Sequence, residues 1–143
     1  MGKYGCNPPI FGKHTMEDSV APKRLFLLSG HKAFREAMAC VLEQESDLEV
    51  VSQAGSLADM AEANLDHNID VALVGLSRSD RDGMMAAIRE LSTQHGDVVV
   101  LALSSVSAPS IIERALESGA ARVLATPASL EEVMDAIRNS ARG

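Results

Sequence analysis

Short apolar runs alternate with amphipathic segments five times along the chain, starting at Lys23. Three of the runs are almost wholly apolar, as expected for strands of a parallel sheet that helices cover on both faces. The second run alternates between apolar and polar residues, so we expect it at an edge of the sheet. The predicted strands span residues 24–29, 48–53, 70–76, 98–104 and 122–125.

In the segments between and after these runs, apolar residues recur at spacings of three and four residues. This spacing predicts helices that each turn one apolar stripe toward the sheet. The five stripes are Phe34, Met38, Val41 and Leu42; Leu57, Met60, Ala61 and Leu65; Met84, Ala87, Ile88 and Leu91; Ile111, Ile112, Ala115 and Leu116; and Leu130, Val133, Met134 and Ile137. Ser129 and Glu132 precede and open the last helix, which predicts a capping box.

Five strands, each followed by a helix, predict an α/β fold. With right-handed crossovers, the expected architecture is a flavodoxin-like, doubly wound, five-stranded parallel sheet of order 2-1-3-4-5 with helices on both faces. Ligands of such sheets bind beyond the carboxyl ends of the strands, at the switch point between the first and third strands. The residues at these strand ends are Ser29, Gly30, Gly75, Leu76, Ser104, Ser105, Thr126 and Pro127.

Composition adds a domain boundary to this picture. Residues 1–22 mix Gly, Pro, Asn and charged residues without a period, so we expect a flexible leader, followed by one domain over residues 23–143. A chain of 143 residues, 46% of them hydrophobic, is large enough to bury a core without disulfides or metal.

Charge and cysteine content restrict the surroundings of the protein. A formal net charge of -7 argues against direct binding to nucleic acid, which needs clustered Lys and Arg. No stretch reaches the ~18 continuous apolar residues of a membrane span, and the first residues lack the apolar block of a secretory signal. The spacing of Cys6 and Cys40 suggests neither a disulfide framework nor a metal site, so we expect free thiols. These features predict a cytoplasmic protein without a membrane partner.

Three segments resemble response-regulator receiver domains, particularly those of LuxR-type regulators. They are RLFLLSGHKAFREAM at the first strand and helix, DVALVGL followed by Asp82-Gly83, and ALESGAARVLATPASLEEVMDAIR near the end. The resemblance covers roughly residues 23–139. It implies a CheY-like domain of a bacterial two-component phosphorelay, in a regulator that controls transcription.

Receivers of this family carry two acidic residues after the first strand, an acceptor Asp at the end of the third, Ser or Thr after the fourth and Lys after the fifth. Phosphoryl transfer to a carboxylate needs that nucleophile, a divalent cation held by acidic oxygens, and a cation beside the phosphoryl oxygens. This chain has Ser29 and Gly30 at the acidic pair, Gly75 at the acceptor and Thr126 at the lysine, and only Ser104 matches. The resemblance therefore implies a degenerate phosphorylation pocket, or pseudo-receiver.

Other interpretations of these residues stay open. Gly30 and Gly75 could serve tight turns, and Ser104 could be a strand-end hydroxyl that bonds a backbone amide. A displaced acceptor at Asp80 or Asp82 is disfavoured, because a loop carboxylate would lack the positioned metal and lysine. By resemblance to the family's Lys-Pro pair, we also predict a cis peptide bond before Pro127.

The sequence is relevant to three classes of function. The first is a phosphorylation-independent regulatory domain that acts through protein contacts, as a homodimer or with a partner protein or output domain. The alternative is a small-ligand sensor that uses the vacated pocket at the strand ends. An enzyme is disfavoured, because the sequence has no Gly-rich phosphate loop, nucleophile elbow or plausible triad. We expect no catalytic residue, cofactor or metal.

Overall fold

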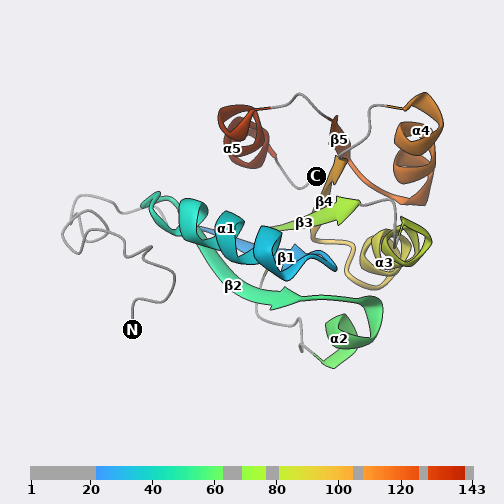
Figure 1. Cartoon of the computed structure of the whole chain (residues 1–143), viewed down its shortest axis with the longest axis horizontal. Coiled ribbons are helices and arrows are strands. Elements are labelled where there is room, and N and C mark those ends of the chain that lie inside the picture. The colour runs from blue at the N-terminus through green and yellow to red at the C-terminus, as the bar shows by residue number, and fades with distance from the viewer. Residues whose placement is uncertain (1–21, 63–68, 77–80, 105–107, 126–128, 141–143) are drawn as a thin grey trace.

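The computed structural model of the chain describes residues 22–62, 69–76, 81–104, 108–125 and 129–140. Its five parallel strands form one sheet in the order β2-β1-β3-β4-β5 (Figure 1). The strands are β1 (Lys23–Leu28), β2 (Leu48–Ala54), β3 (Val71–Leu76), β4 (Val99–Ser104) and β5 (Arg122–Ala125). The predicted fold class and strand order are confirmed, and β2 lies at an edge as its alternating pattern indicated.

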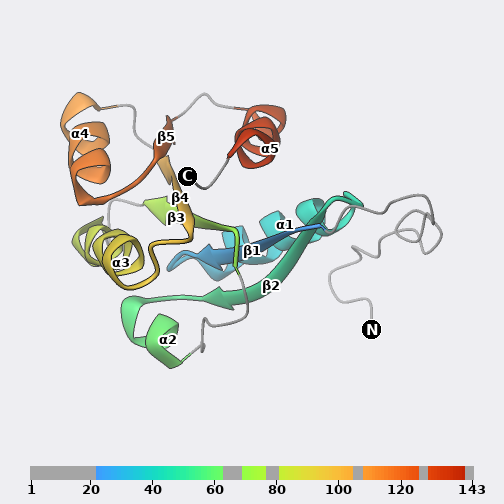
Figure 2. The same cartoon turned by 180° about the vertical axis from the view of Figure 1, so that it is seen from behind.

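Five helices connect and follow the strands: α1 (Lys32–Glu43), α2 (Leu57–Glu62), α3 (Arg81–Gln94), α4 (Pro109–Ser118) and α5 (Leu130–Asn139). Helices α1 and α5 lie on one side of the sheet, and α2, α3 and α4 lie on the other (Figures 1 and 2). Two apolar clusters follow from this arrangement, one on each face of the sheet. Because β3 is central and every one of its residues is buried, it contributes side chains to both clusters.

The apolar stripes of the helices are buried to different extents. The α3 stripe is fully buried, whereas in α1 only Leu42 is buried and the rest of the stripe is half-buried. The prediction that every stripe faces the sheet is wrong at Leu116, which is 46% exposed, and at Leu130, which is 39% exposed. Both lie in the helices beside β5, an edge strand of four residues that offers little surface to cover. Leu65 lies outside the described residues.

Local signals at two helix ends behave as the sequence suggests. The Glu132 amide donates to Ser129 Oγ at 3.1 Å and the Ser129 amide donates to Glu132 Oε1 at 2.7 Å, which confirms the capping box. Gly119 ends α4 with φ 125°, a conformation that favours glycine. A Cβ at Gly119 would also collide with the Ser92 side chain. These ends fix the two helices that flank β5.

Two predictions about the surroundings of the chain have different outcomes. Cys40 is disulfide-bonded, so the prediction of free thiols is wrong at this residue, and Cys6 lies outside the described residues. Spacing excludes a multi-bridge framework but not a single bridge, which needs only that two Cα atoms come close in the folded chain. Within the described ranges, no helix is long and apolar enough to cross a membrane. The leader boundary and the cytoplasmic location stay predictions.

Candidate functional site at the carboxyl ends of the strands

The fold brings three of the predicted site residues to the same edge of the sheet. Ser29 directly follows β1, Gly75 is the penultimate residue of β3, and Ser104 ends β4. Because Leu28 pairs with Val74, the next residue pair along these strands places Ser29 beside Gly75. Ser29 is 2% exposed and Ser104 is 6% exposed.

The other predicted site residues are not part of this buried group. Gly30 is exposed beyond the end of β1. Thr126 and Pro127 lie outside the described residues, so the replaced lysine and the cis peptide bond stay predictions. Gly75 itself lies inside β3 and, unlike Gly119, has no positive φ. The open interpretation that Gly75 serves a tight turn therefore loses its basis.

The space in front of Gly75 is crowded by its neighbours. A Cβ built on Gly75 would lie 3.2 Å from both Cβ and Oγ of Ser29, and 3.3 Å from Cε2 of Phe34. These separations are tighter than ordinary van der Waals contact, so any side chain at this position would displace Ser29 or Phe34. Two neutral side chains thus occupy the space in front of Gly75.

Sequence reasoning missed the role of Phe34, which was placed only in the apolar stripe of α1. The helix starts four residues after β1 ends, and Phe34 lies in its first turn. A large side chain in that turn is close in sequence to the carboxyl end of β1. This position is the signal that could have identified Phe34 as a neighbour of Gly75.

Ser29 uses its polar atoms to connect β1 with its surroundings. Its amide donates to the Ala54 carbonyl at 3.1 Å, and its Oγ accepts from the His31 amide at 3.1 Å. Its carbonyl accepts from Arg35 Nε at 2.9 Å. The first bond joins β1 to the end of β2 and the other two join it to the start of α1. Ser29 therefore holds this strand end in place through two bonds with backbone groups and one bond from the Arg35 guanidinium.

The described aspartates that flank β3 in sequence have partners of their own, and the Asp59 carboxylate lies beside Gly55, just after β2. Asp70 precedes β3 at the opposite end of the sheet, where its Oδ2 accepts from the Arg24 amide at 2.9 Å. Asp82 lies in the first turn of α3, is 89% exposed, and pairs with Arg114 of α4 at 3.0 Å. Asp80 lies outside the described residues. Across the described residues, no group of three or more His, Cys, Asp or Glu side chains could hold a metal ion.

The strand order, the paired helix layers and the buried switch point between β1 and β3 define a CheY-like α/β domain. The profile of the response regulator receiver domain family matches residues 26–138. The chain belongs to this family. The predicted receiver fold and family are thus confirmed.

Named relatives agree with this assignment. The transcriptional regulatory protein PdtaR of Mycobacterium tuberculosis is 29% identical over 126 residues, which are 88% of this chain and 60% of PdtaR. The transcriptional regulatory protein LiaR of Bacillus subtilis is 26% identical over 120 residues, which are 84% of this chain and 56% of LiaR. The chain therefore spans somewhat less than two thirds of the length of these relatives.

Solved structures share the fold. The signal receiver domain of NarL from Mycobacterium tuberculosis superposes with a TM-score of 0.70 at 25% identity, and the match covers 85% of this chain and 100% of that one. A DNA-binding response regulator of the LuxR family from Staphylococcus aureus also has a TM-score of 0.70, at 18% identity, over 81% of this chain and 96% of that one. The second likeness concerns the fold alone.

Proposed function

We propose that this receiver domain works without aspartyl phosphorylation and acts through contacts with other proteins. The observation that carries the proposal is Gly75, buried in β3 with Ser29 and Phe34 against it. The family's acceptor position thus has no side chain to phosphorylate. Its immediate surroundings are neutral and closely packed.

The chemistry of phosphoryl transfer supports the proposal from a second direction. A divalent cation at this edge would need acidic oxygens, and Ser29 and Gly30 supply none at the positions of the family's acidic pair. Ser29 Oγ already accepts from the backbone of His31. Without a nucleophile and an acidic metal site, no phosphoryl group has a place to be held.

Protein contacts need exposed surface, and two large apolar side chains supply it. Leu116 of α4 and Leu130 of α5 are exposed in the helices that flank β5. Isolated exposed leucines are common, and these two lie in helices on opposite sides of the sheet, so each helix offers a separate candidate contact surface. We propose a homodimer or a partner protein or output domain in contact with one of these helices, in a LuxR-type regulator of transcription. The domain itself would bind no nucleic acid, act without a cofactor, and catalyse no reaction.

The test is incubation with acetyl phosphate and Mg²⁺, followed by intact-mass measurement. The native chain is expected to gain no phosphoryl group. A positive control carries Ser29→Asp, Gly30→Asp, Gly75→Asp and Thr126→Lys, which restores the family's pattern, with Phe34→Leu to relieve crowding. A stable phosphoryl adduct on the native chain would contradict the proposal, and peptide mapping would locate it.

The alternative, a small-ligand sensor at the strand ends, needs open space at the vacated positions. The contacts of Ser29 and Phe34 with the space in front of Gly75 argue for closure instead. A ligand that binds the native state must raise its melting temperature. In a thermal-shift panel of metabolites, we therefore expect no rise in melting temperature that changes in Phe34→Ala. A metabolite that raises the melting temperature of the native chain but not of Phe34→Trp would support the sensor.

A further inference from the structure

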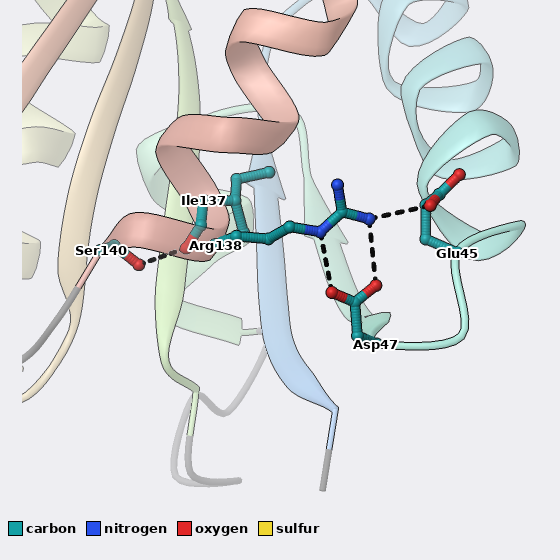
Figure 3. A network of polar contacts seen from close by, with 5 residues as sticks. All are labelled: Glu45, Asp47, Ile137, Arg138 and Ser140. Atoms are coloured by element: carbon teal, nitrogen blue, oxygen red, sulfur yellow. Dashed lines mark hydrogen bonds and ion pairs between the residues drawn. The ribbon is translucent and has the colours of Figure 1, made fainter. Parts of the chain in front are cut away.

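Arg138, in the last turn of α5, binds two acidic residues of the segment between α1 and β2. Its Nε donates to Asp47 Oδ2 at 2.8 Å and its Nη2 donates to Asp47 Oδ1 at 3.1 Å (Figure 3). The same Nη2 donates to Glu45 Oε1 at 2.8 Å. The paired bonds to Asp47 match the planar fork of guanidinium to the two oxygens of a carboxylate, a geometry that fixes direction as well as distance.

A second set of bonds holds the same end of α5. Lys23 Nζ, at the start of β1, donates to the Ser140 carbonyl at 3.2 Å, and the Lys23 amide donates to the Asp47 carbonyl at 3.0 Å. Ser140 Oγ donates to the Ile137 carbonyl at 2.6 Å. Lys23 therefore joins both the acidic segment and the end of α5. Three parts of the chain, far apart in sequence, form one closed set of contacts.

The charges in this cluster act on one another. The Arg138 guanidinium, through its hydrogen bonds, holds the pKa of the Asp47 carboxyl below its usual value of 3.8. Asp47 and then Glu45 raise the pKa of Arg138 above its usual value. The Arg138 and Glu45 side chains are 34% and 37% exposed, so they are partly shielded from solvent. Isolated surface ion pairs contribute little, but a bidentate pair within a network is the exception.

We propose that Lys23, Glu45, Asp47, Arg138 and Ser140 form a clamp that fixes the end of α5 against the sheet. The clamp holds the point from which the chain continues past Ser140 in one orientation. The clamp lies at the amino-terminal ends of the strands, away from Gly75. The proposal of a clamp therefore does not depend on the proposed function.

Packing beneath the clamp explains why it can be local. Ile137 is fully buried in the cluster between the sheet and helices α1 and α5, whereas Arg138 points outward from the next position. Loss of the Arg138 side chain would leave Ile137 buried and release only the final turn of α5. The clamp therefore predicts that exchange rises most at the end of α5, whereas a contact that supports only global stability would raise exchange equally at all strongly protected amides.

Amide hydrogen exchange of the full chain, read by NMR, tests the clamp in Arg138→Gln. Exchange at Asn139 and Ser140 is expected to rise about ten-fold, as for a released helix end, while exchange at Leu73 in β3 rises by a clearly smaller factor, because it reports only the loss of global stability. Arg114→Gln is the matched control, because it removes the single Arg114–Asp82 pair between α3 and α4. It is expected to leave Asn139 and Ser140 unchanged.

Arg138→Lys separates the fork from the charge. Lysine keeps the positive charge but cannot make two parallel bonds to one carboxylate, so its exchange rates should fall between those of the native chain and Arg138→Gln. Unchanged exchange at Asn139 and Ser140 in Arg138→Gln would overturn the clamp. An equal rise at Leu73 would overturn it as well, because the contact would then support global stability only.

Discussion

The carboxyl ends and the amino-terminal ends of the strands differ in the charged contacts that they make. At the carboxyl ends of the strands, neutral Ser29 and Phe34 pack against Gly75. At the amino-terminal ends, Arg138 forms ion pairs with Asp47 and Glu45, and Lys23 joins the same cluster through bonds to backbone carbonyls. Around Gly75 the packing is close and the nearest side chains are neutral, with the Arg35 guanidinium bound to the Ser29 carbonyl, whereas the opposite edge holds a guanidinium paired with two carboxylates. The charged side chains at the amino-terminal ends of the strands join separate elements of the fold.

The largest expected loss of stability comes from a buried side chain of α5, and it distinguishes the contribution of packing from that of the ion pairs at the end of this helix. Ile137→Ala removes a fully buried side chain directly beside Arg138. Large-to-small core substitutions of this kind cost about 2–5 kcal/mol, because the neighbours refill the cavity only in part. Urea denaturation should show this loss. A cost similar to that of Arg138→Ala would mean that the buried face of α5 contributes little.

A pair of glycine substitutions tests the crowding at the other edge. Gly75→Ala is expected to lower the free energy of unfolding by about 1 kcal/mol, because its methyl group meets Ser29 and Phe34 in a packed region. Gly83→Ala is the matched control in α3, where a Cβ meets nothing within 4 Å. It should raise that free energy by about 1 kcal/mol, the usual gain from alanine in a helix. Stabilisation by both would show that the space at Gly75 is open.

Removal of the guanidinium measures the clamp directly. Arg138→Ala is expected to cost about 1 kcal/mol, since the pairs are partly exposed and screened. In a double-mutant cycle with Asp47→Asn, the double variant should lose less unfolding free energy than the two single variants lose together. Arg114→Ala, which breaks a pair whose Asp82 partner is 89% exposed, should change stability by less than about 0.5 kcal/mol. Strict additivity of Arg138→Ala and Asp47→Asn would mean that the clamp contributes no coupling.

Acid should remove a fraction of the same stabilisation. The pKa of Asp47 is lowered in the folded chain by Arg138, so folding favours the ionised carboxylate. The stabilisation is complete above the unfolded value of about 3.9 and is lost as pH falls through the folded pKa. The stability difference between the native chain and Asp47→Asn should therefore shrink from about pH 6 to below about pH 3. Urea denaturation at both pH values measures it, and a difference that stays constant would contradict the pKa assignment.

Much of the fold could be predicted because burial leaves a direct pattern in the sequence. Strand β3 is buried on both faces and appears as a continuous apolar run, and the α3 stripe recurs at helical spacing. The pattern failed at Leu116 and Leu130, because it does not report how much sheet a helix finds beside a short edge strand.

The candidate site was predicted in part. Strand order was enough to bring Ser29, Gly75 and Ser104 to one edge. The place of Phe34 in the first turn of α1 indicates that it lies near the carboxyl end of β1, but its contact with the space at Gly75 also depends on how α1 returns over the sheet. The same holds for Arg138 and Asp47, which are 91 positions apart and meet only after folding. Long-range contacts between polar side chains leave no periodic signal.

Phosphorylation by a small-molecule donor tests the central claim most directly. Intact-mass spectra of the native chain, taken after acetyl phosphate and Mg²⁺, should be identical to those of the untreated protein. The variant with the family's acidic pair, acceptor and lysine restored should gain one phosphoryl group under the same conditions. A phosphoryl adduct on the native chain, mapped to any aspartate at the carboxyl ends of the strands, would contradict the account.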